Sequence, residues 1–216
     1  MHPEGIGAPV RRREDSKFLT GRGNYVSNLS FEGELHCAFV RSPHAHARVR
    51  RIATEKSAGA AGVVAVYTGA DMAADDVGTM IPLWRIPGAG GTSMSEPPRW
   101  ALARGTVRHV GEAVAMVVAS SRNQALDAAE LVEVEWEALA SVVDVRDAVK
   151  PDAPQLHPEA PGNLVVRFER GNEAAARDAF AQARHVVKVD LVNHRIICAA
   201  MEPRAVIAIE IGRAHV

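Results

Sequence analysis

The chain has 216 residues, of which 47% are hydrophobic and 24% charged, and its formal net charge is −1. It is too apolar for a disordered protein, and a charge near zero gives no long-range attraction to nucleic acid or anionic lipid. Five Phe, three Trp and two Tyr are too few for a base-stacking platform. No apolar run suits a signal peptide or membrane span, and two distant cysteines, Cys37 and Cys198, exclude a disulfide scaffold. We therefore expect a soluble globular protein of a reducing compartment, the cytoplasm.

Both ends of the sequence stand apart from this globular pattern. Residues 1–16 carry Arg11, Arg12 and Arg13 followed by two acidic residues, which is typical of a solvated N-terminal arm. Residues 210–216 read EIGRAHV, which resembles one reading frame of a widely used sequencing-library adapter. The sequence therefore suggests read-through at residues 210–216, and we expect the chain to be a fragment.

Strands are expected in the first part of the chain, from alternating or β-branched runs at residues 33–42, 47–53 and 62–68. Thr54 is placed to cap a brief helical turn that ends near Gly59. The run at 62–68 is apolar at nearly every position, which is typical of a central strand covered on both faces.

A long loop is expected next, because residues 71–98 lack apolar periodicity. Residues 107–110 and 113–119 flank Gly111 and predict a hairpin or a bulged strand. Ser120 or Ser121 then caps a helix.

The expected buried stripe of that helix is apolar at helical spacing and consists of Ala125, Ala128, Ala129 and Val132. The next strand places Val132, Val134 and Trp136 inside and three glutamates outside. Trp136 is expected to pack against the helix at residues 124–132.

The second part of the chain begins with a proline-rich linker at residues 151–162. Beyond it the patterns predict strands and one helix whose inward residues are Ala176, Phe180 and Ala183. The strands are expected at residues 164–168, 185–193 and 204–210, and the helix at 173–184. Strands and helices without a regular βαβ rhythm indicate an α+β class, with a boundary in the linker.

Three groups of residues invite a chemical interpretation. The Gly88 to Gly91 run lacks the flanking strand, helix and Lys-Ser/Thr pair of a phosphate loop, which favours a loop tip. Glu133, Glu135 and Glu137 form a continuous glutamate face, which indicates a solvated sheet surface rather than an acid–base pair. His44 and His46 could share a metal ion with either His36 or His109. No further ligand stands at a recognisable spacing, which favours a histidine-bearing turn instead. No nucleophile or metalloprotease motif occurs, so the residues alone indicate no catalytic machinery and no metal site.

Several segments in a fixed order carry a resemblance to a known family. They are LTGRGNYV (19–26), LHCAFVRSPHAHARV (35–49), GVVAVYTGADM (62–72), VRHVGEAVAMVVA (107–119), AAELVEVEWEAL (128–139) and AAMEPRAVIA (199–208). Together they resemble the N-terminus of the molybdopterin-binding large subunit of the xanthine dehydrogenase, aldehyde oxidase and carbon monoxide dehydrogenase family.

That resemblance implies an α/β hammerhead domain at residues 17–150 and, after the linker, the start of the first molybdopterin-binding domain at 163–209. It implies a molybdopterin-type molybdenum cofactor in the full-length protein. It also implies a bacterial enzyme with an iron–sulfur small subunit and a flavin-binding (FAD) medium subunit as partners. The glutamate that acts as general base and the glycine-rich segments that cradle the pterin would all lie downstream, so the resemblance places no catalytic residue in this chain.

One departure from the family concerns a cofactor contact. Relatives often read Asn-Gln-Arg where this chain has Asn193-His194-Arg195, and the family glutamine contacts an oxo ligand of molybdenum. The resemblance therefore places His194 at a cofactor-binding position, with an imidazole in place of an amide. Ala200 stands where relatives often have proline, and Cys198 does not match the copper-binding cysteine of carbon monoxide dehydrogenases.

Two functional hypotheses follow. The first is a truncated large subunit of a molybdenum hydroxylase, which oxidatively hydroxylates an aldehyde, an N-heterocycle or a related carbon centre, the fragment alone being inactive. The second is a stand-alone, non-catalytic hammerhead-type binding or assembly module. The strand expected at 204–210 would be left as an unpaired edge, which favours the first. The substrate is not determined by these residues.

Overall fold

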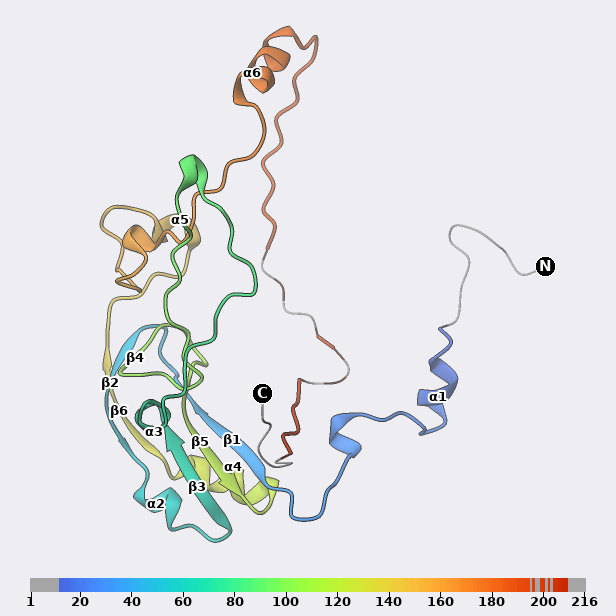
Figure 1. Cartoon of the computed structure of the whole chain (residues 1–216), viewed down its shortest axis with the longest axis vertical. Coiled ribbons are helices and arrows are strands. Elements are labelled where there is room, and N and C mark those ends of the chain that lie inside the picture. The colour runs from blue at the N-terminus through green and yellow to red at the C-terminus, as the bar shows by residue number, and fades with distance from the viewer. Residues whose placement is uncertain (1–11, 195, 197–198, 201, 203, 210–216) are drawn as a thin grey trace, which may run out of the picture. The chain divides into compact units, whose positions relative to one another are not determined.

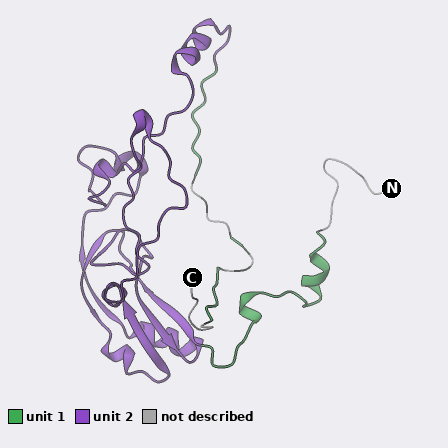
Figure 2. Cartoon of the chain, viewed as in Figure 1, with its two compact units in different colours: residues 1–34, 187–216 green, residues 35–186 purple. Residues whose placement is uncertain are grey.

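The computed structural model describes residues 12–194, 196, 199–200, 202 and 204–209. The chain forms two compact units, shown in Figure 2. Residues 35–186 form the strand-rich unit, and residues 1–34 with 187–216 form the terminal unit. The expected adapter read-through at 210–216 and the first eleven residues of the expected arm lie outside the described residues.

The first sheet of the strand-rich unit has the strand order β1-β5-β3, and all its pairs are antiparallel. Its strands are β1 (His36–Arg41), β3 (Val63–Thr68) and β5 (Ala113–Ala119). The strand at 62–68 was expected to be central, and this is wrong, because β5 pairs with both neighbours and leaves β3 at an edge (Figure 1).

Helix α4 (Arg122–Glu130) covers one face of this sheet. Ser121 Oγ accepts a hydrogen bond from the Gln124 amide at 3.3 Å, so the expected serine cap is confirmed. Ala125 and Ala128 are each 1% exposed and pack against the β5 alanines and Val117, as the predicted stripe requires.

A short helix, α2 (Glu55–Ala58), packs beside α4 and β3. It occupies the helical turn expected before Gly59. The Thr54 side chain, however, makes no capping hydrogen bond, because the Thr54 backbone is already in the helical region.

The second sheet has the order β4-β2-β6, from β2 (Ala47–Ala53), β4 (Thr106–Val107) and β6 (Glu133–Ala138). The hairpin or bulged strand expected at 107–119 is therefore wrong, since β4 pairs with β2 while β5 belongs to the first sheet. The backbone changes sheets at Gly111, whose φ of 87° is strained for other residues. The β2–β6 ladder has a bulge between Val49 and Arg51.

The core where the two sheets meet is built from small side chains. Ala47, Val107 and Val114 are fully buried, and the half-buried Trp136 packs against this cluster. The inward facing predicted for Trp136 is confirmed, but its neighbours are these sheet residues rather than α4. Sequence alternation fixes which face a side chain takes, whereas the crossing of the sheets decides what it meets.

The segment at 71–98 was expected to be a loop throughout, and its first residues are instead helical. Thr68 and Asp71 form a reciprocal capping box at the start of α3 (Gly69–Ala74). Beyond it the two limbs of a long arm, residues 77–100, run side by side. The Met80 amide donates to the Arg99 carbonyl at 2.9 Å, and the Arg85 guanidinium donates to Glu96 Oε2 at 3.0 Å.

The proline-rich segment follows α5 (Val145–Ala148) and is held by hydrogen bonds. Asn163 Nδ2 donates to the carbonyls of Ala148 and Pro154, each at 2.9 Å, and Asn163 Oδ1 accepts from the Leu156 amide. Ala160 is 2% exposed. The strand-rich unit continues through this segment, and the domain boundary expected here stays a prediction.

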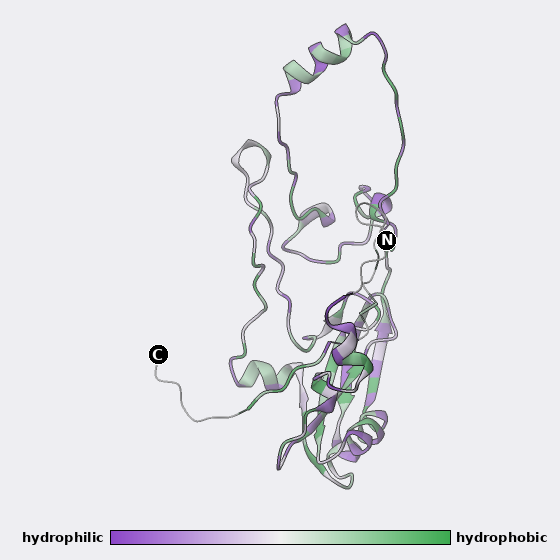
Figure 3. Ribbon diagram, turned by 90° about the vertical axis from the view of Figure 1, so that its right-hand side faces the viewer, coloured by the Kyte–Doolittle hydropathy of each residue, from purple (hydrophilic) through white to green (hydrophobic). Residues whose placement is uncertain are grey.

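Helix α6 (Glu173–Gln182) forms where a helix was expected, and Asn172 caps it. Its expected inward face is wrong: all ten residues are exposed, Phe180 at 65%. Figures 1 and 3 show α6 away from both sheets. Nor do the expected strands at 164–168, 185–193 and 204–209 form in the described residues. The 164–168 segment accepts two backbone hydrogen bonds from the long arm, from the Ser95 amide at Val165 and from the Ala89 amide at Arg167, without forming a strand.

The terminal unit contains α1 (Asp15–Leu19) and a 3-10 turn, η1 (Val26–Asn28). The rings of Phe18 and Tyr25 stack with centroids 5.6 Å apart. In the part of the chain that is described, no helix is both long and apolar enough to cross a lipid bilayer.

Candidate functional site

The residue expected at a cofactor position, His194, lies in the terminal unit. It is exposed in a segment without regular secondary structure, and Arg195, Ile197 and Cys198 lie outside the described residues. The expected contact of His194 with a cofactor stays a prediction.

A hydrogen bond in the same unit joins two of the family-like segments. Glu202 Oε1 accepts from the Val26 amide at 2.8 Å, across 176 residues of sequence. Glu202 belongs to the AAMEPRAVIA segment and Val26 closes LTGRGNYV. The sequence patterns did not single out Glu202 itself, although the AAMEPRAVIA segment that contains it carries part of the family resemblance. This carboxylate joins the segments around residues 26 and 202 within the terminal unit.

The four histidines considered as metal ligands have separate surroundings. The His44 ring lies 5.4 Å from the Trp136 ring, and His46 Nδ1 lies 2.6 Å from the Ala140 carbonyl. His36 begins β1, and His109 belongs to the turn before β5. Among the described residues, no group of three or more His, Cys, Asp or Glu is arranged to hold a metal ion.

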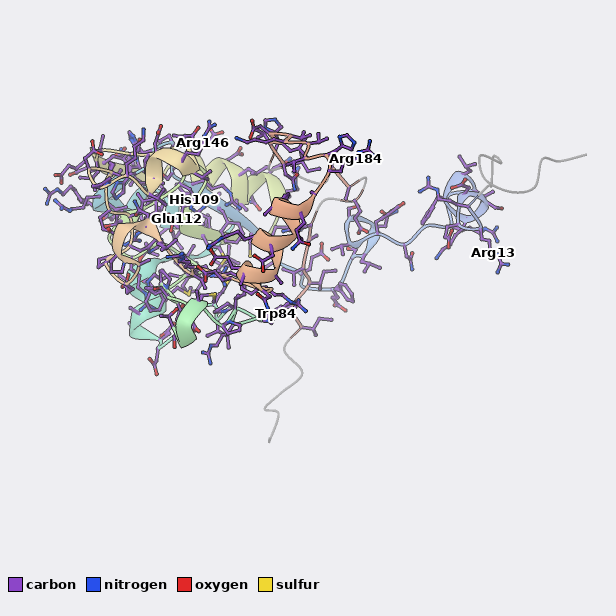
Figure 4. All side chains as sticks on the ribbon, turned by 90° about the horizontal axis from the view of Figure 1, so that it is seen from above. Arg13, Trp84, His109, Glu112, Arg146 and Arg184 are labelled. Carbon is purple, nitrogen blue, oxygen red and sulfur yellow. The ribbon has the colours of Figure 1, made fainter. Side chains whose placement is uncertain are left out.

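Glu112 organises the turn that carries the chain from the second sheet to the first. Its carbonyl accepts from the Ser42 amide at 2.8 Å, and its Oε2 accepts from the Arg108 amide at 2.6 Å. His109 Nδ1 lies 3.5 Å from the same carboxylate, and Figure 4 shows the two side chains close together. Glu112 of the VRHVGEAVAMVVA segment therefore closes a turn, and its carboxylate accepts a hydrogen bond from a backbone amide.

His157 lies beside this turn and has a perturbed environment. Burial lowers the pKa of His157, and the positive charge of Arg108 lowers it further. Its Nδ1 is buried without a hydrogen-bond partner. The Arg108 Nε donates to the Leu156 carbonyl at 2.8 Å, so this cluster fastens the proline-rich segment to the sheets.

The glycine run forms the tip of the long arm. Residues Ala89–Gly91 make a 3-10 turn, η2, between extended limbs rather than between a strand and a helix. The Ala89 amide donates to the Arg167 carbonyl at 2.7 Å, and the Ser95 amide to the Val165 carbonyl at 2.8 Å. A cavity of about 550 Å³ lies between these two segments and is open to solvent. Its polar lining comes from hydroxyls of the arm with Arg167 and Glu169.

A second cavity, of about 360 Å³, has mostly small or apolar lining residues and includes three arginines: Arg50, Arg51 and Arg104. Arg104 lies over the Trp100 ring, 3.6 Å from its centroid, and donates to the Val77 carbonyl at 2.9 Å. Arg50 and Arg51 are already paired with glutamates of β6.

The three glutamates of β6 are paired with cations and lie on a solvated face, as predicted. Glu133 pairs with Lys56, Glu135 with Arg51, and Glu137 with Arg48 and Arg50. The hydrogen bond from Lys56, and then its charge, lower the pKa of Glu133. A general acid needs the opposite shift, so this face is structural.

Comparison with known proteins gives these surfaces a context. Residues 20–140 match the family described as aldehyde oxidase and xanthine dehydrogenase, a/b hammerhead domain. The nicotine 6-hydroxylase large subunit of Paenarthrobacter nicotinovorans is 38% identical over 203 residues, covering 94% of this chain and 24% of that protein. The carbon monoxide dehydrogenase large chain of Afipia carboxidovorans is 37% identical over 205 residues, covering 89% and 24%.

Solved structures agree with the sequence relatives. Quinoline 2-oxidoreductase from Pseudomonas putida 86 has a TM-score of 0.68 at 38% identity, over 82% of this chain and 22% of that one. Carbon-monoxide-reduced Cu,Mo-CO dehydrogenase has a TM-score of 0.65 at 34% identity, over 85% and 23%. The chain thus spans about a quarter of the length of the curated relatives it matches.

Proposed function

This chain belongs to the aldehyde oxidase and xanthine dehydrogenase family and contains its hammerhead domain, and from that premise we propose that it is the N-terminal part of the large subunit of a molybdenum hydroxylase. The observation that carries the proposal is the co-linear match of 94% of this chain to 24% of a hydroxylase large subunit. The family-like segments occur in both units. Two of them are joined by the hydrogen bond from the Val26 amide to Glu202 Oε1.

The proposed reaction of the whole protein is oxidative hydroxylation of an aldehyde, an N-heterocycle or a related carbon centre. Its electrons would leave through an iron–sulfur small subunit and an FAD-binding medium subunit, in the bacterial cytoplasm. Relatives of this kind form complexes, as in the gamma subunit of the 6-hydroxypseudooxynicotine dehydrogenase complex. The matched relatives include nicotine, carbon monoxide and xanthine enzymes, so the substrate class is left at this breadth.

The described residues do not fit a complete cofactor pocket. His194 is exposed, and the described part of the chain has no group of three metal-ligating side chains around one point. We therefore assign no reaction step to residues of this chain, and we propose that the chain alone is inactive. Its contribution would be to build and position the hammerhead domain.

We also propose that His194 contacts the cofactor once the complete subunit surrounds it. An imidazole N–H can donate one hydrogen bond, as an amide can, but with a different reach. In the full-length protein, His194→Gln should keep the molybdenum content and change the molybdenum electron paramagnetic resonance signal. An unchanged signal would contradict this role.

The proposal is tested by reading the gene beyond the Glu210 codon and expressing both products. A continuing frame whose protein contains molybdenum and oxidises substrates with an artificial electron acceptor supports it. The 216-residue chain should contain no molybdenum and show no such activity. A natural stop codon after this chain, with a stable monomeric product, would contradict the proposal and support a stand-alone binding module.

A further inference from the structure

The first sheet has one face that no other element of the strand-rich unit covers, which we call the outer face. Ladder partners lie on the same side of a sheet, and the pairs Phe39–Met116–Tyr67 and Cys37–Val118–Ala65 cross all three strands. A bulge between Val63 and Ala65 turns Val64 away from the core as well. The outer face therefore consists of seven uncharged residues: Cys37, Phe39, Val64, Ala65, Tyr67, Met116 and Val118.

The inner face of the same sheet, which α4 covers, provides the comparison for the exposed fractions of the outer-face side chains. Ala115, Val117 and Ala119 are fully buried beneath α4. On the outer face, Phe39 is 46% exposed and Val64 58% exposed. The guanidinium of Arg41 lies 5.4 Å from the Phe39 ring centroid, at the margin of the face.

This pattern does not suit a face that stays in water. The solvated face of the second sheet carries charged side chains at successive outward positions of β2 and β6. In contrast, β5 has no polar residue at any of its seven positions, a pattern of strands covered on both sides. One covering layer, α4 with α2, is present, and the pattern calls for a second.

We infer that the outer face is an interdomain surface, buried against an apolar surface of the remaining part of the large subunit. The inference rests on the proposed function. The relatives are about four times as long as this chain, and the outer face lies inside the matched hammerhead domain, so most of the protein remains to cover it. The absence of charge among these seven residues favours a permanent protein contact over an anionic partner.

Cys37 provides a probe, because it is a free, exposed thiol on the outer face. The experiment compares maleimide labelling of Cys37, followed by peptide mass spectrometry, in the 216-residue chain and in the full-length subunit in its complex. We expect labelling about tenfold slower or more in the full-length protein, since burial excludes the reagent. Glu135→Cys on the second sheet is the matched control and should be labelled equally in both proteins.

The outcomes separate the inference from the proposed function. Equal labelling of Cys37 in a molybdenum-containing, active full-length protein overturns the interdomain surface and leaves the function intact. If the gene encodes no longer large subunit, or if the full-length subunit contains no molybdenum, the proposed function and the inferred partner are overturned together. Protection of Cys37 in the short chain that grows with protein concentration would show a second copy on this face and overturn the inference.

A substitution tests the same surface without labelling. Phe39→Ala should lower the urea unfolding midpoint of the full-length subunit more than that of the 216-residue chain, in which the Phe39 side chain is still 46% exposed. Met116→Leu, which keeps volume and polarity, is the control and should change neither. Equal shifts from Phe39→Ala in both proteins would mean that Phe39 has no additional neighbour in the longer protein.

Discussion

The two sheets of the strand-rich unit share a core, but their outward faces differ in the side chains they carry, which are charged on the second sheet and uncharged on the first. On β6 every second residue is a glutamate, and each is matched by a cation from β2 or α2. On β5 the outward positions beyond the shared core are Met116 and Val118. The difference teaches that the exposure of a sheet face has to be interpreted together with the residue pattern of its strands. Charged side chains at the outward positions indicate a solvated face, whereas a strand that is apolar at every position is typical of one covered on both faces.

The largest effect should come from Trp136, on the inner face of the second sheet. Trp136→Ala removes the large ring that packs on the Ala47, Val107 and Val114 cluster, and should cost about 3 kcal/mol of unfolding free energy. Glu135→Ala, on the solvated face of the same strand, should cost less than about 0.5 kcal/mol. Urea unfolding followed by circular dichroism measures both, and equal losses would show that the strand's faces are reversed.

The two faces of β5 give the next comparison. Val117→Ala should destabilise the chain by about 2 kcal/mol, because Val117 is fully buried beneath α4. Val118→Ala, one residue further on the outer face, should cost less than about 1 kcal/mol in this chain. If Val118→Ala costs as much as Val117→Ala, the outer face is already covered and the contrast between the sheets disappears.

At the end of β3, the capping box between Thr68 and Asp71 is a local set of hydrogen bonds that does not depend on either face of the sheet. Thr68→Ala removes the capping box of α3 and should cost about 1 kcal/mol, while Thr68→Ser should keep most of it. Hydrogen bonds from Thr68 lower the pKa of Asp71 below the ordinary 3.8. The resulting stabilisation is present above that pH and is lost as the pH falls through the lowered pKa.

An acid titration of stability therefore checks the capping box independently. The wild-type chain should lose this contribution below pH 3.8, and Asp71→Asn should remove that part of the pH dependence. An unchanged acid limb in the variant would mean that the Asp71 carboxylate does not cap α3 in solution.

The smallest effect is expected on the charged face. Lys56→Met should return the pKa of Glu133 towards 4.5 and change stability little, since both side chains are largely exposed. Carboxyl-carbon NMR titration measures the shift, and Lys188→Met, which removes an exposed lysine of the terminal unit, is the control. A Glu133 pKa that stays low without Lys56 would point to Arg51 as the main cause.

Local patterns in the sequence determined several elements of this protein. Alternation set the faces of β6, with Trp136 inside and the glutamates outside, and Ser121 marked the start of α4 with its alanine stripe. These features depend on neighbours within a few residues, where side-chain period and capping chemistry decide the outcome. The ordered segments likewise identified the hammerhead domain, since a family signature is itself a property of sequence.

Long-range pairing was decided only by the tertiary structure. That β5 rather than β3 is central, that β4 and β5 enter different sheets at Gly111, and that Trp136 meets β4 and β5 rather than α4 all depend on contacts between distant residues. An apolar strand can pair at an edge or in the centre with the same sequence, because backbone hydrogen bonds do not distinguish their partners. For the same reason the segments at 164–168 and 185–193 have strand-like patterns and form no strand here: strand formation needs a partner, and the sequence of one segment does not supply it.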